Sequence, residues 1–536
     1  MVGMAVWRVV AALALSGAVA GPAMGTPATP ATPAAAAIAG TLDATQPGPV
    51  LSKYLQGQFV EHLGRGVDGG IWVGPDSAIP NTRGIRNDVT AALRAIKVPV
   101  VRWPGGCFAD IYHWRDGIGQ PAGRPVRRND WWGGLENNAF GTHEYFDFLD
   151  QIGSESYLAI NMATSTPSEM RQWLGYITSS GNDTLAQERR ANGRQQPWRV
   201  GFVGIGNEPW GCGGAYSAEH FAEEYRRFAT FMHRNGSTFH MHNENNALRV
   251  AAGPNNADTV WMDTLLKNAA PMMDAVSVHY YTTYEGEWAR RNEAPATGFP
   301  AAHWNGILYQ ASRMDAVLAA HSAVMDRYDP QKRIGLYVDE WGTWYAPERG
   351  TEPGDLAQQN SLRDALVTAI TLNIFHAHAD RVRMANIAQA VNVLQAMILT
   401  DGPAMALTPT YHVFRLYTPF QDARALPITL ASPMLGAGDA RFPAISISAA
   451  AGRDGKTHVA IANADAEKPY RLSIRINGAT ARRVSGEVLT AQQLDAHNVP
   501  GQPVQIAPAP FRGARLSAGQ LTIDMPAHAV VVLALD

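Results

Sequence analysis

The chain is 536 residues long, 46% of its residues are hydrophobic, and its formal net charge at pH 7 is −3. This length predicts two or three domains, and the composition is typical of globular domains with large cores. A charge so close to zero gives no electrostatic reason to expect nucleic acid or an anionic membrane surface as a partner. The two cysteines form neither a CxxC pair nor a Cys/His zinc spacing.

The first 25 residues have the pattern of a secretory signal peptide. Arg8 precedes a short apolar stretch, and Ala18-Val19-Ala20 is a small-residue cleavage pattern. These features predict export to the periplasm or the cell exterior, with no membrane anchor because the apolar run is too short to span a bilayer. The alternative is a disordered cytoplasmic N-terminus. Residues 26–39 are rich in Ala, Pro and Thr and predict a flexible linker.

Residues 55–405 show strands alternating with helices. Short apolar runs that end in polar residues recur here, at residues 57–61, 98–103, 157–161, 200–205, 249–253, 275–281, 334–341 and 384–389. Eight strands that alternate with helices are typical of a (β/α)8 TIM barrel. The rival fold, a doubly wound open sheet, is not favoured because no GxGxxG follows the first strand.

Helix signals lie between these strands. Thr166 and Glu169 frame a first turn that contains a proline, which is typical of a helix start. Ser217 is a candidate cap for a helix over residues 218–234. Apolar residues recur with helical spacing over residues 355–376 and predict another helix.

Residues 406–536 predict an all-β sandwich of the jelly-roll type. An Asp454-Gly455 turn joins strands predicted at residues 444–448 and 458–463. Further alternating or apolar runs predict strands at residues 470–476, 521–525 and 530–535. Residues 40–54, which precede the barrel, are expected to add a strand to this sandwich.

Polar side chains end almost every predicted barrel strand, at the edge where barrel active sites lie. Glu208 and Glu340 end the fourth and seventh strands. Such a pair suits a retaining glycosidase, in which one carboxylate attacks the anomeric carbon and the other protonates the leaving oxygen. Trp210 and Trp341 are expected to bury Glu208 and so raise its pKa. The alternative for any one of these polar residues is a cap or loop residue that satisfies the backbone.

This chemistry requires no cofactor or metal. The HxH patterns at His240 and His242 and at His376 and His378 are weak metal signals on their own. The 14 Trp and 17 Tyr fit a carbohydrate cleft, since sugar rings stack on flat aromatic faces, although ordinary core packing explains most of them.

Six motifs resemble those of the glycoside hydrolase family 51 α-L-arabinofuranosidases and run in that family's order. They are Gly57-Gln58-Phe59-Val60-Glu61-His62-Leu63-Gly64-Arg65, Val101-Arg102-Trp103-Pro104-Gly105-Gly106-Cys107-Phe108, Gly206-Asn207-Glu208, Val278-His279-Tyr280-Tyr281, Asp339-Glu340-Trp341 and Asn386-Ile387-Ala388-Gln389-Ala390-Val391-Asn392. The first and last are specific to the family, whereas a Glu at the ends of strands four and seven is shared by a wider clan of retaining barrel glycosidases. The family's C-terminal β-sandwich also matches residues 406–536.

The resemblance implies roles by position. It makes Glu208 the general acid/base and Glu340 the nucleophile, with Tyr281 orienting Glu340. The substrate-binding residues would be Asn207 on the sugar 2-OH, Glu61 on the arabinofuranosyl hydroxyls, Gln389 on the floor of the subsite, and Arg102, Cys107 and His279. Many family members have Asn where this chain has Cys107. A branch of the family carries Cys at this position, so the activity is not excluded, but the amide contact to the sugar is in doubt.

Cys107 and Cys212 follow the ends of strands two and four, on the same predicted face of the barrel. In an exported protein this placement favours a disulfide, which would fix the loops beside Glu208. The alternative is two free, partly buried thiols.

Together these features predict a retaining, exo-acting α-L-arabinofuranosidase that removes terminal arabinofuranosyl groups from arabinoxylan, arabinan or their oligosaccharides. The alternatives are another retaining barrel glycosidase, such as a β-xylosidase or an endo-glycanase, and a non-catalytic carbohydrate-binding protein. The expected partner is the arabinose-containing carbohydrate, and self-association is a further expectation because family members often form homo-oligomers.

Overall fold

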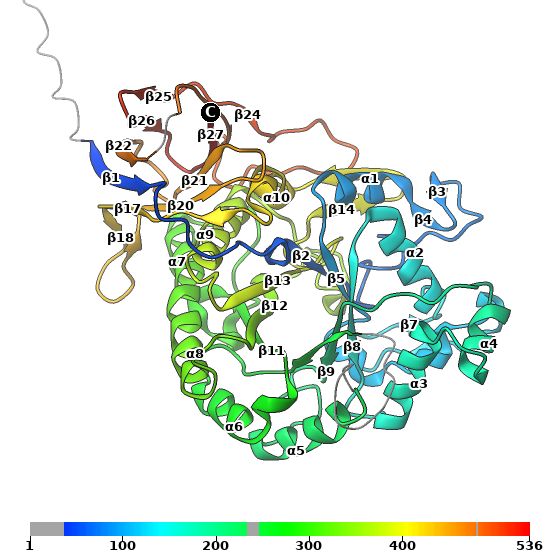
Figure 1. Ribbon diagram of the computed structural model, residues 1–536. Helices are drawn as coiled ribbons and strands as arrows, with labels where there is room; N and C mark the ends of the chain where they lie inside the picture. The colour runs from blue at the N-terminus through cyan, green and yellow to red at the C-terminus, as the bar shows by residue number, and fades with distance from the viewer. Residues whose placement is uncertain (1–36, 233–245, 479–480) are drawn as a thin grey trace, which may run out of the picture. The chain divides into compact units, whose positions relative to one another are not determined.

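Eight parallel strands close a barrel in the part of the chain that the computed structural model describes, which is residues 37–232, 246–478 and 481–536. Their order around the barrel is their order in the chain, and the last strand pairs with the first (Figure 1). They are β2 (Gly57–Phe59), β5 (Val100–Trp103), β8 (Glu155–Ile160), β9 (Phe202–Ile205), β10 (Leu248–Ala251), β11 (Ala275–Thr282), β12 (Gly335–Thr343) and β13 (Val382–Ala388). The predicted TIM barrel is confirmed, and each predicted strand overlaps one of these.

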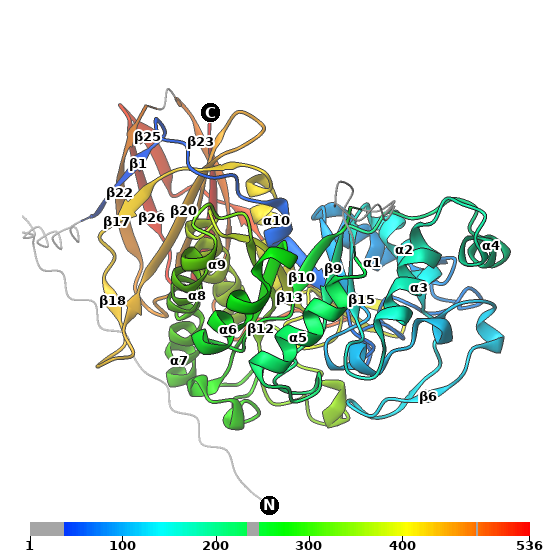
Figure 2. The ribbon, with the colours of Figure 1, turned by 60° about the horizontal axis from the view of Figure 1, so that its bottom comes forward.

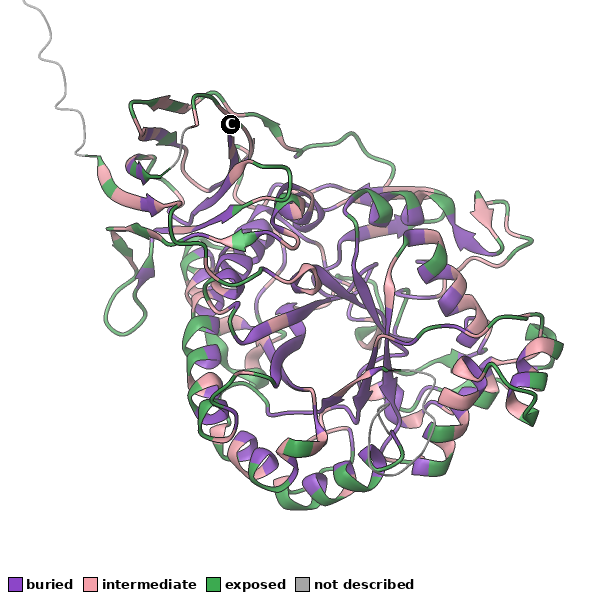
Figure 3. Ribbon diagram, viewed as in Figure 1, coloured by how far each residue is buried: buried purple, intermediate pink, exposed green. Residues whose placement is uncertain are grey.

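α-Helices surround the barrel strands. They are α1 (Asn87–Ala95), α2 (Thr142–Ile152), α3 (Pro167–Thr178), α4 (Thr184–Ala191), α5 (Ala218–Ala229), α6 (Thr259–Ala269), α7 (Ala301–Ser312), α8 (Met314–Tyr328), α9 (Leu362–Ala377) and α10 (Pro409–Tyr417). The strands are buried, while most of the outer helices alternate buried and exposed residues (Figure 3). This pattern places one core between the strands and their helices.

Two helix boundaries differ from the prediction. Helix α9 begins at Leu362 rather than at 355, because Ser361 and Asp364 form a capping box in which the Ser361 N–H donates to Asp364 Oδ2 at 2.7 Å. Helix α5 starts after Ser217 as predicted but ends at Ala229; the last two residues of the predicted helix, 233–234, lie outside the described residues.

Two mostly antiparallel sheets form the C-terminal β-sandwich. One sheet has the order β17-β1-β22-β26-β25 and the other β16-β20-β21-β27-β23-β24. Their strands are β1 (Ile38–Asp43), β16 (Arg424–Ala425), β17 (Ile428–Leu430), β20 (Ile445–Ala451), β21 (Thr457–Asn463), β22 (Tyr470–Asn477), β23 (Val484–Leu489), β24 (Ala509–Pro510), β25 (Ala514–Ser517), β26 (Gln520–Met525) and β27 (Ala529–Leu535). Apolar side chains from both sheets, including Leu42, Ile474 and Val531, fill the core between them.

Helix α9 lies against β20 (Figure 2) and β21. It is buried along almost its whole length. His376 on this helix contacts Ser448 Oγ through Nδ1 at 3.0 Å, whereas His378 contacts Asp315 Oδ1 at 2.8 Å. Burial lowers the pKa of His376 to about 3. The two rings of this HxH pattern therefore contact different partners. The other HxH pattern, His240 and His242, lies outside the described residues.

Short ribbons complete the described structure. They are β3 (Asn81–Thr82) with β4 (Ile85–Arg86), β6 (Arg127–Arg128) with β7 (Leu135–Glu136), β14 (Ile398–Asp401) with β15 (Ala404–Leu407), and β18 (Met434–Leu435) with β19 (Phe442–Pro443). The predicted signal peptide lies outside the described residues, and β1 begins inside the predicted linker. Among the described helices, none has both the length and the apolar character needed to cross a bilayer.

Candidate active site

Glu208 and Glu340 meet at the carboxyl ends of the barrel strands. Glu208 Oε1 lies 2.9 Å from His279 Nδ1, and Glu340 Oε2 lies 3.5 Å from the same nitrogen. One ligand atom from each of these three side chains lies within 4.8 Å of the other two. Glu208 has a φ of +38°, a backbone conformation that non-glycine residues rarely adopt.

A break in strand register aims two consecutive acids of β12 into the barrel. Along β11, Ser277 pairs with Tyr337 but His279 pairs with Glu340, so β12 has one extra residue at this point. Such a bulge interrupts the usual alternation of side chains. Asp339 and Glu340 consequently both contact Arg102 and His279. Sequence reasoning assigned no role to Asp339.

Arg102 joins the two strand ends that carry the acids. From β5, its guanidinium donates to Glu340 Oε1 and to Asn207 Oδ1, each at 2.7 Å, and its Nε lies 3.7 Å from Asp339 Oδ2. The side chain is only 2% exposed. A buried cation with this set of partners compensates the negative charge of β12 and orients Asn207.

His279 lies between three carboxylates. Its Nδ1 faces Glu208, and its Nε2 lies 3.1 Å from Asp339 Oδ1. The Tyr157 hydroxyl donates to the other oxygen of Asp339, Oδ2, at 2.6 Å. Burial alone would lower the pKa of His279, but the nearby carboxylates of Glu340, Asp339 and Glu208 raise it to about 10. For the acid Asp339 burial acts in the opposite direction and would raise the pKa, but Arg102 and His279 hold this pKa below its usual value.

The two acids of the pair have different surroundings. Burial raises the pKa of Glu208; the hydrogen bond from His279 opposes this shift, and the charge of Glu340 adds to it. Glu340 instead accepts hydrogen bonds from Arg102 and, at 2.9 Å, from the Tyr281 hydroxyl. The surroundings of Glu208 therefore favour its protonated form.

The predicted burial of Glu208 by Trp341 is wrong. The Trp341 ring packs edge-on against Phe375 of α9 and stacks near Phe414 of α10, on the helix side of β12. It follows Glu340 in an extended strand, so it points to the opposite face. Trp210 donates its indole N–H to the Gly253 carbonyl at 3.1 Å.

Glu61 occupies the other side of the site, after β2. Its Oε1 accepts hydrogen bonds from the backbone N–H groups of Gly106 and Phe108 at 3.0 and 2.9 Å. Gln389 contacts it twice, accepting from the Glu61 N–H and donating to Glu61 Oε2. Burial, with a contribution from the charge of Glu340, raises the pKa of Glu61 to about 7.

Glycines allow the β5 loop to fit between the two sides of the site. A Cβ on Gly105 would lie 2.6 Å from Glu61 Cγ, and a Cβ on Gly106 would lie 2.9 Å from Glu340 Oε1. Both distances are too short for a larger residue, which explains the Pro-Gly-Gly sequence in this loop.

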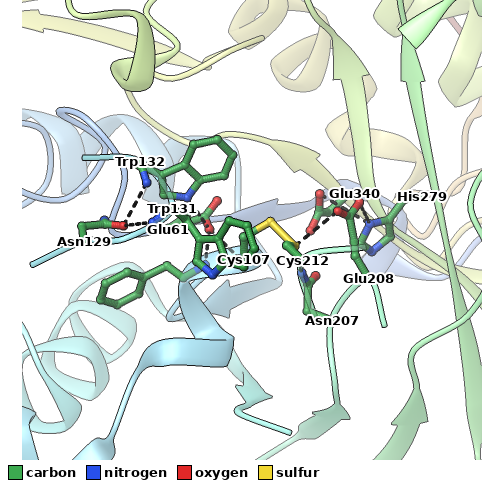
Figure 4. The surroundings of a disulfide bond; sticks show 12 residues. Glu61, Cys107, Asn129, Trp131, Trp132, Asn207, Glu208, Cys212, His279 and Glu340 are labelled. Carbon is green, nitrogen blue, oxygen red and sulfur yellow. Dashed lines mark hydrogen bonds and ion pairs between the residues drawn. A yellow bond between two sulfur atoms is a disulfide. The ribbon is translucent and has the colours of Figure 1, made fainter. Parts of the chain in front are cut away.

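Trp132 is a contact of Glu61 that sequence reasoning missed. Its indole N–H donates to Glu61 Oε1 at 3.0 Å. Asn129 holds the segment by accepting from the Trp132 N–H (Figure 4) and donating to the His62 carbonyl. The neighbouring Trp131 is 46% exposed. The pair of tryptophans in an otherwise polar segment was the available signal.

Cys107 and Cys212 are joined in a disulfide, the pairing favoured from their positions. The bond connects the short 3-10 turn at Cys107–Ile111, after β5, to the loop after β9. Cys212 Sγ lies 3.6 Å from Glu208 Oε2 and 3.6 Å from Asn207 Nδ2 (Figure 4). The disulfide thus lies between the Glu61 side and the Glu208 side of the site.

Two family models match the chain. A model described as the α-L-arabinofuranosidase 1 domain covers residues 92–293, and one described as the α-L-arabinofuranosidase C-terminal domain covers residues 339–529. An intracellular exo-α-L-arabinofuranosidase of Bacteroides ovatus is 42% identical over 92% of this chain and 95% of its own length.

Solved structures agree with these matches. The GH51 arabinofuranosidase of Xanthomonas axonopodis pv. citri is 49% identical, with a TM-score of 0.90 over 93% of this chain and 100% of its own. The arabinose complex of the Thermotoga maritima α-L-arabinofuranosidase is 27% identical, with a TM-score of 0.81 over 93% and 99%. These matches favour an arabinofuranosidase over a β-xylosidase, an endo-glycanase or a non-catalytic binding protein.

The predicted export is contradicted by the match to the Bacteroides ovatus relative. The Bacteroides ovatus relative is named an intracellular enzyme, so the predicted signal peptide and the periplasmic or extracellular location are not supported. That prediction rested on the composition of a short segment, with one arginine before an alanine-rich run, and composition of this kind does not specify a destination by itself.

Proposed function

The chain belongs to the GH51 family of α-L-arabinofuranosidases, and we propose that it removes terminal α-L-arabinofuranosyl groups with retention of configuration. The observation that carries the proposal is the close approach of Glu208 and Glu340, which have carboxylate oxygens within 4.8 Å of each other. Retaining glycosidases place their two carboxyl groups about 5–5.5 Å apart, whereas inverting enzymes need about 6.5–9.5 Å to admit a water.

In the first step, Glu340 attacks the anomeric carbon while Glu208 protonates the leaving oxygen. Arg102 and Tyr281 donate to the two oxygens of Glu340 and so orient the carboxylate for attack. The raised pKa of Glu208 favours the protonated form needed of an acid. The bond to the leaving oxygen breaks as the ester between Glu340 and the sugar forms.

In the second step, Glu208 acts as a base. Esterification removes the negative charge of Glu340, which had contributed to the raised pKa of Glu208. The pKa of Glu208 therefore falls, and its carboxylate takes a proton from the water that attacks the ester. Hydrolysis returns Glu340 to its ionised state and Glu208 to its protonated state.

Glu61, Gln389 and Asn207 bind the arabinofuranosyl hydroxyls in a terminal subsite. Glu61 and Gln389 are each 2% exposed and, with Trp132, close the side of the site opposite the catalytic pair. A closed side admits the end of a chain or a side group rather than the middle of a polymer. Arabinoxylan, arabinan and their oligosaccharides carry such arabinofuranosyl groups.

The experiment that tests these roles uses p-nitrophenyl α-L-arabinofuranoside with sodium azide. In Glu208→Ala, azide is expected to restore activity and to yield the α-azide, because it attacks the glycosyl-enzyme on Glu340. In Glu340→Ala, azide replaces the nucleophile itself and is expected to yield the β-azide. If each variant gives the anomer expected of the other, the two roles are reversed; absence of activity in the wild type would contradict the proposed function.

A further inference from the structure

The disulfide and Glu208 form a cluster whose sulfur atoms have no part in the proposed hydrolysis. One ligand atom from each of Cys107, Cys212 and Glu208 lies within 4.8 Å of the other two. All three residues are partly exposed, so a small thiol and a metal ion can reach them. Figure 4 shows the disulfide beside Glu208.

We propose that reduction of the Cys107–Cys212 bond creates a site for one soft or borderline divalent cation, zinc or cadmium, and that the bound cation inhibits the enzyme. The ligands are the two thiolates and Glu208 Oε2, and a water completes a tetrahedral shell. Two cysteines and one carboxylate are a ligand set that suits such ions.

The spacing of the cluster fits this coordination. The Cα atoms of the two cysteines are 5.5 Å apart, and two thiolates on one zinc lie roughly 3.8 Å from each other because each Zn–S bond is about 2.3 Å long. Rotation of the two side chains after reduction is enough to reach that separation. Glu208 Oε2 already faces Cys212 Sγ at 3.6 Å.

The contacts of Glu208 leave one oxygen for the ion. Oε1 faces His279 Nδ1, which itself is fixed by Asp339 at its Nε2. A carboxylate ligand whose second oxygen is held in this way is oriented as in many metal sites. Both ring nitrogens of His279 have partners, so the neighbouring cluster of Glu208, His279 and Glu340 has no free imidazole nitrogen to offer an ion in the oxidised protein.

The chemistry balances with a dithiol as reductant. The dithiol transfers two electrons and two protons to the Cys107–Cys212 bond, which breaks to give two thiols, while the reductant closes to its own cyclic disulfide. Zinc then binds the two sulfurs with release of their protons. The Bacteroides ovatus relative is named an intracellular enzyme. Disulfides in the reducing interior of most cells are usually transient, catalytic or redox-sensing, which agrees with a redox role for this bond.

Inhibition rests on the proposed role of Glu208, whereas metal binding does not. Glu208 Oε2 bound to a cation can no longer carry the acid proton. Activity is therefore expected to fall by about 100-fold or more, the usual contribution of a general acid/base. Metal binding is measured separately, so the two proposals can fail independently.

The experiment compares the oxidised and reduced forms of the same chain. The protein is reduced with dithiothreitol, freed of it by anaerobic gel filtration, and titrated for thiols. Cadmium is then added, and the thiolate-to-cadmium charge-transfer band is followed; zinc is added in parallel to an arabinofuranosidase assay. We expect one equivalent of cadmium and zinc inhibition in the reduced protein, and neither in the oxidised protein, which serves as the matched control.

Two variants identify the ligands. Reduced Cys212→Ser is expected to lose the one-equivalent cadmium band, and reduced Glu208→Gln to keep the band with an affinity weaker by about tenfold or more, because a neutral amide is a poorer ligand. A disulfide that resists dithiothreitol, a reduced wild type that binds no cadmium, or unchanged affinity in Cys212→Ser would each overturn the site. Unchanged affinity in Glu208→Gln would overturn its link to catalysis.

Discussion

Glu340 and Glu61 are both buried glutamates of the same site, but their partners differ in kind. Glu340 contacts a cation, Arg102, and a hydroxyl, Tyr281. Glu61 contacts neutral N–H donors, from Gly106, Phe108, Trp132 and Gln389. Burial raises the pKa of Glu61 to about 7. Burial alone therefore does not distinguish the two carboxylates; the direct cationic partner is found at Glu340, the proposed nucleophile.

The largest expected effect is on the Glu340 side. Glu340→Ala removes the proposed nucleophile, and kcat on p-nitrophenyl α-L-arabinofuranoside is expected to fall by about 10⁴-fold or more, as for nucleophiles in other covalent enzymes. Glu348→Ala, which removes an exposed carboxylate in the loop after the same strand, is the control and is expected to keep normal activity. A Glu340→Ala enzyme that keeps more than one per cent of wild-type kcat, about a hundredfold loss or less, would contradict the assignment of Glu340 as the nucleophile.

The second prediction concerns stability and tests the Glu61 side. The pKa of Glu61 rises on folding from 4.5 to about 7, so the folded state holds this proton more tightly. The stability it contributes is complete below about pH 4.5 and is lost as pH rises through about 7, by up to about 3 kcal/mol.

Urea unfolding of wild type and Glu61→Gln at several pH values measures this effect. The difference between them cancels the other titrating groups, and the wild type is expected to lose stability relative to the variant between pH 4.5 and 7.5. A difference that does not change with pH would mean that Glu61 is as well stabilised in its charged form as it is in the unfolded chain.

Tyr281→Phe is expected to have a smaller effect on catalysis. The change removes one hydrogen bond to a charged oxygen of Glu340, worth about 1.5–3 kcal/mol, and so lowers kcat by about 10- to 100-fold. The fold is expected to be retained because the ring remains, which circular dichroism and the Tm would verify. An unchanged kcat would show that Arg102 alone orients Glu340.

Trp132→Phe is expected to have the smallest effect. It removes one of several donors to Glu61 and keeps an aromatic ring, so kcat/KM is expected to fall about fivefold, the value of one ordinary hydrogen bond. A loss as large as that in Tyr281→Phe would mean that the hydrogen bonds to Glu61 contribute as much to catalysis as those to Glu340.

Most of the barrel was predictable because its strands are buried on both faces. Each strand is therefore an apolar run, and the polar residue at its end marks the carboxyl edge where side chains from different strands converge. The polar strand ends and the family resemblance together indicated a set of residues that lie in one site, although their roles stay predictions. They are Glu61, Arg102, Asn207, Glu208, His279, Tyr281, Glu340 and Gln389.

The remainder depends on features with no periodic signal. Trp132 reaches Glu61 from an irregular segment, and Asp339 faces inward only because a bulge interrupts β12. The start of α9 depends on the local box between Ser361 and Asp364. The outward position of Trp341, in contrast, follows from strand alternation next to Glu340, so that error was avoidable.

The stereochemistry of transfer to methanol is the most direct test of the double displacement. The wild-type enzyme is incubated with p-nitrophenyl α-L-arabinofuranoside in aqueous methanol, and the methyl arabinofuranoside that forms is assigned by proton NMR. A covalent intermediate on Glu340 that is released with the help of Glu208 predicts the α-anomer alone. Formation of the β-anomer would contradict the assignment of Glu208 and Glu340 to the two steps.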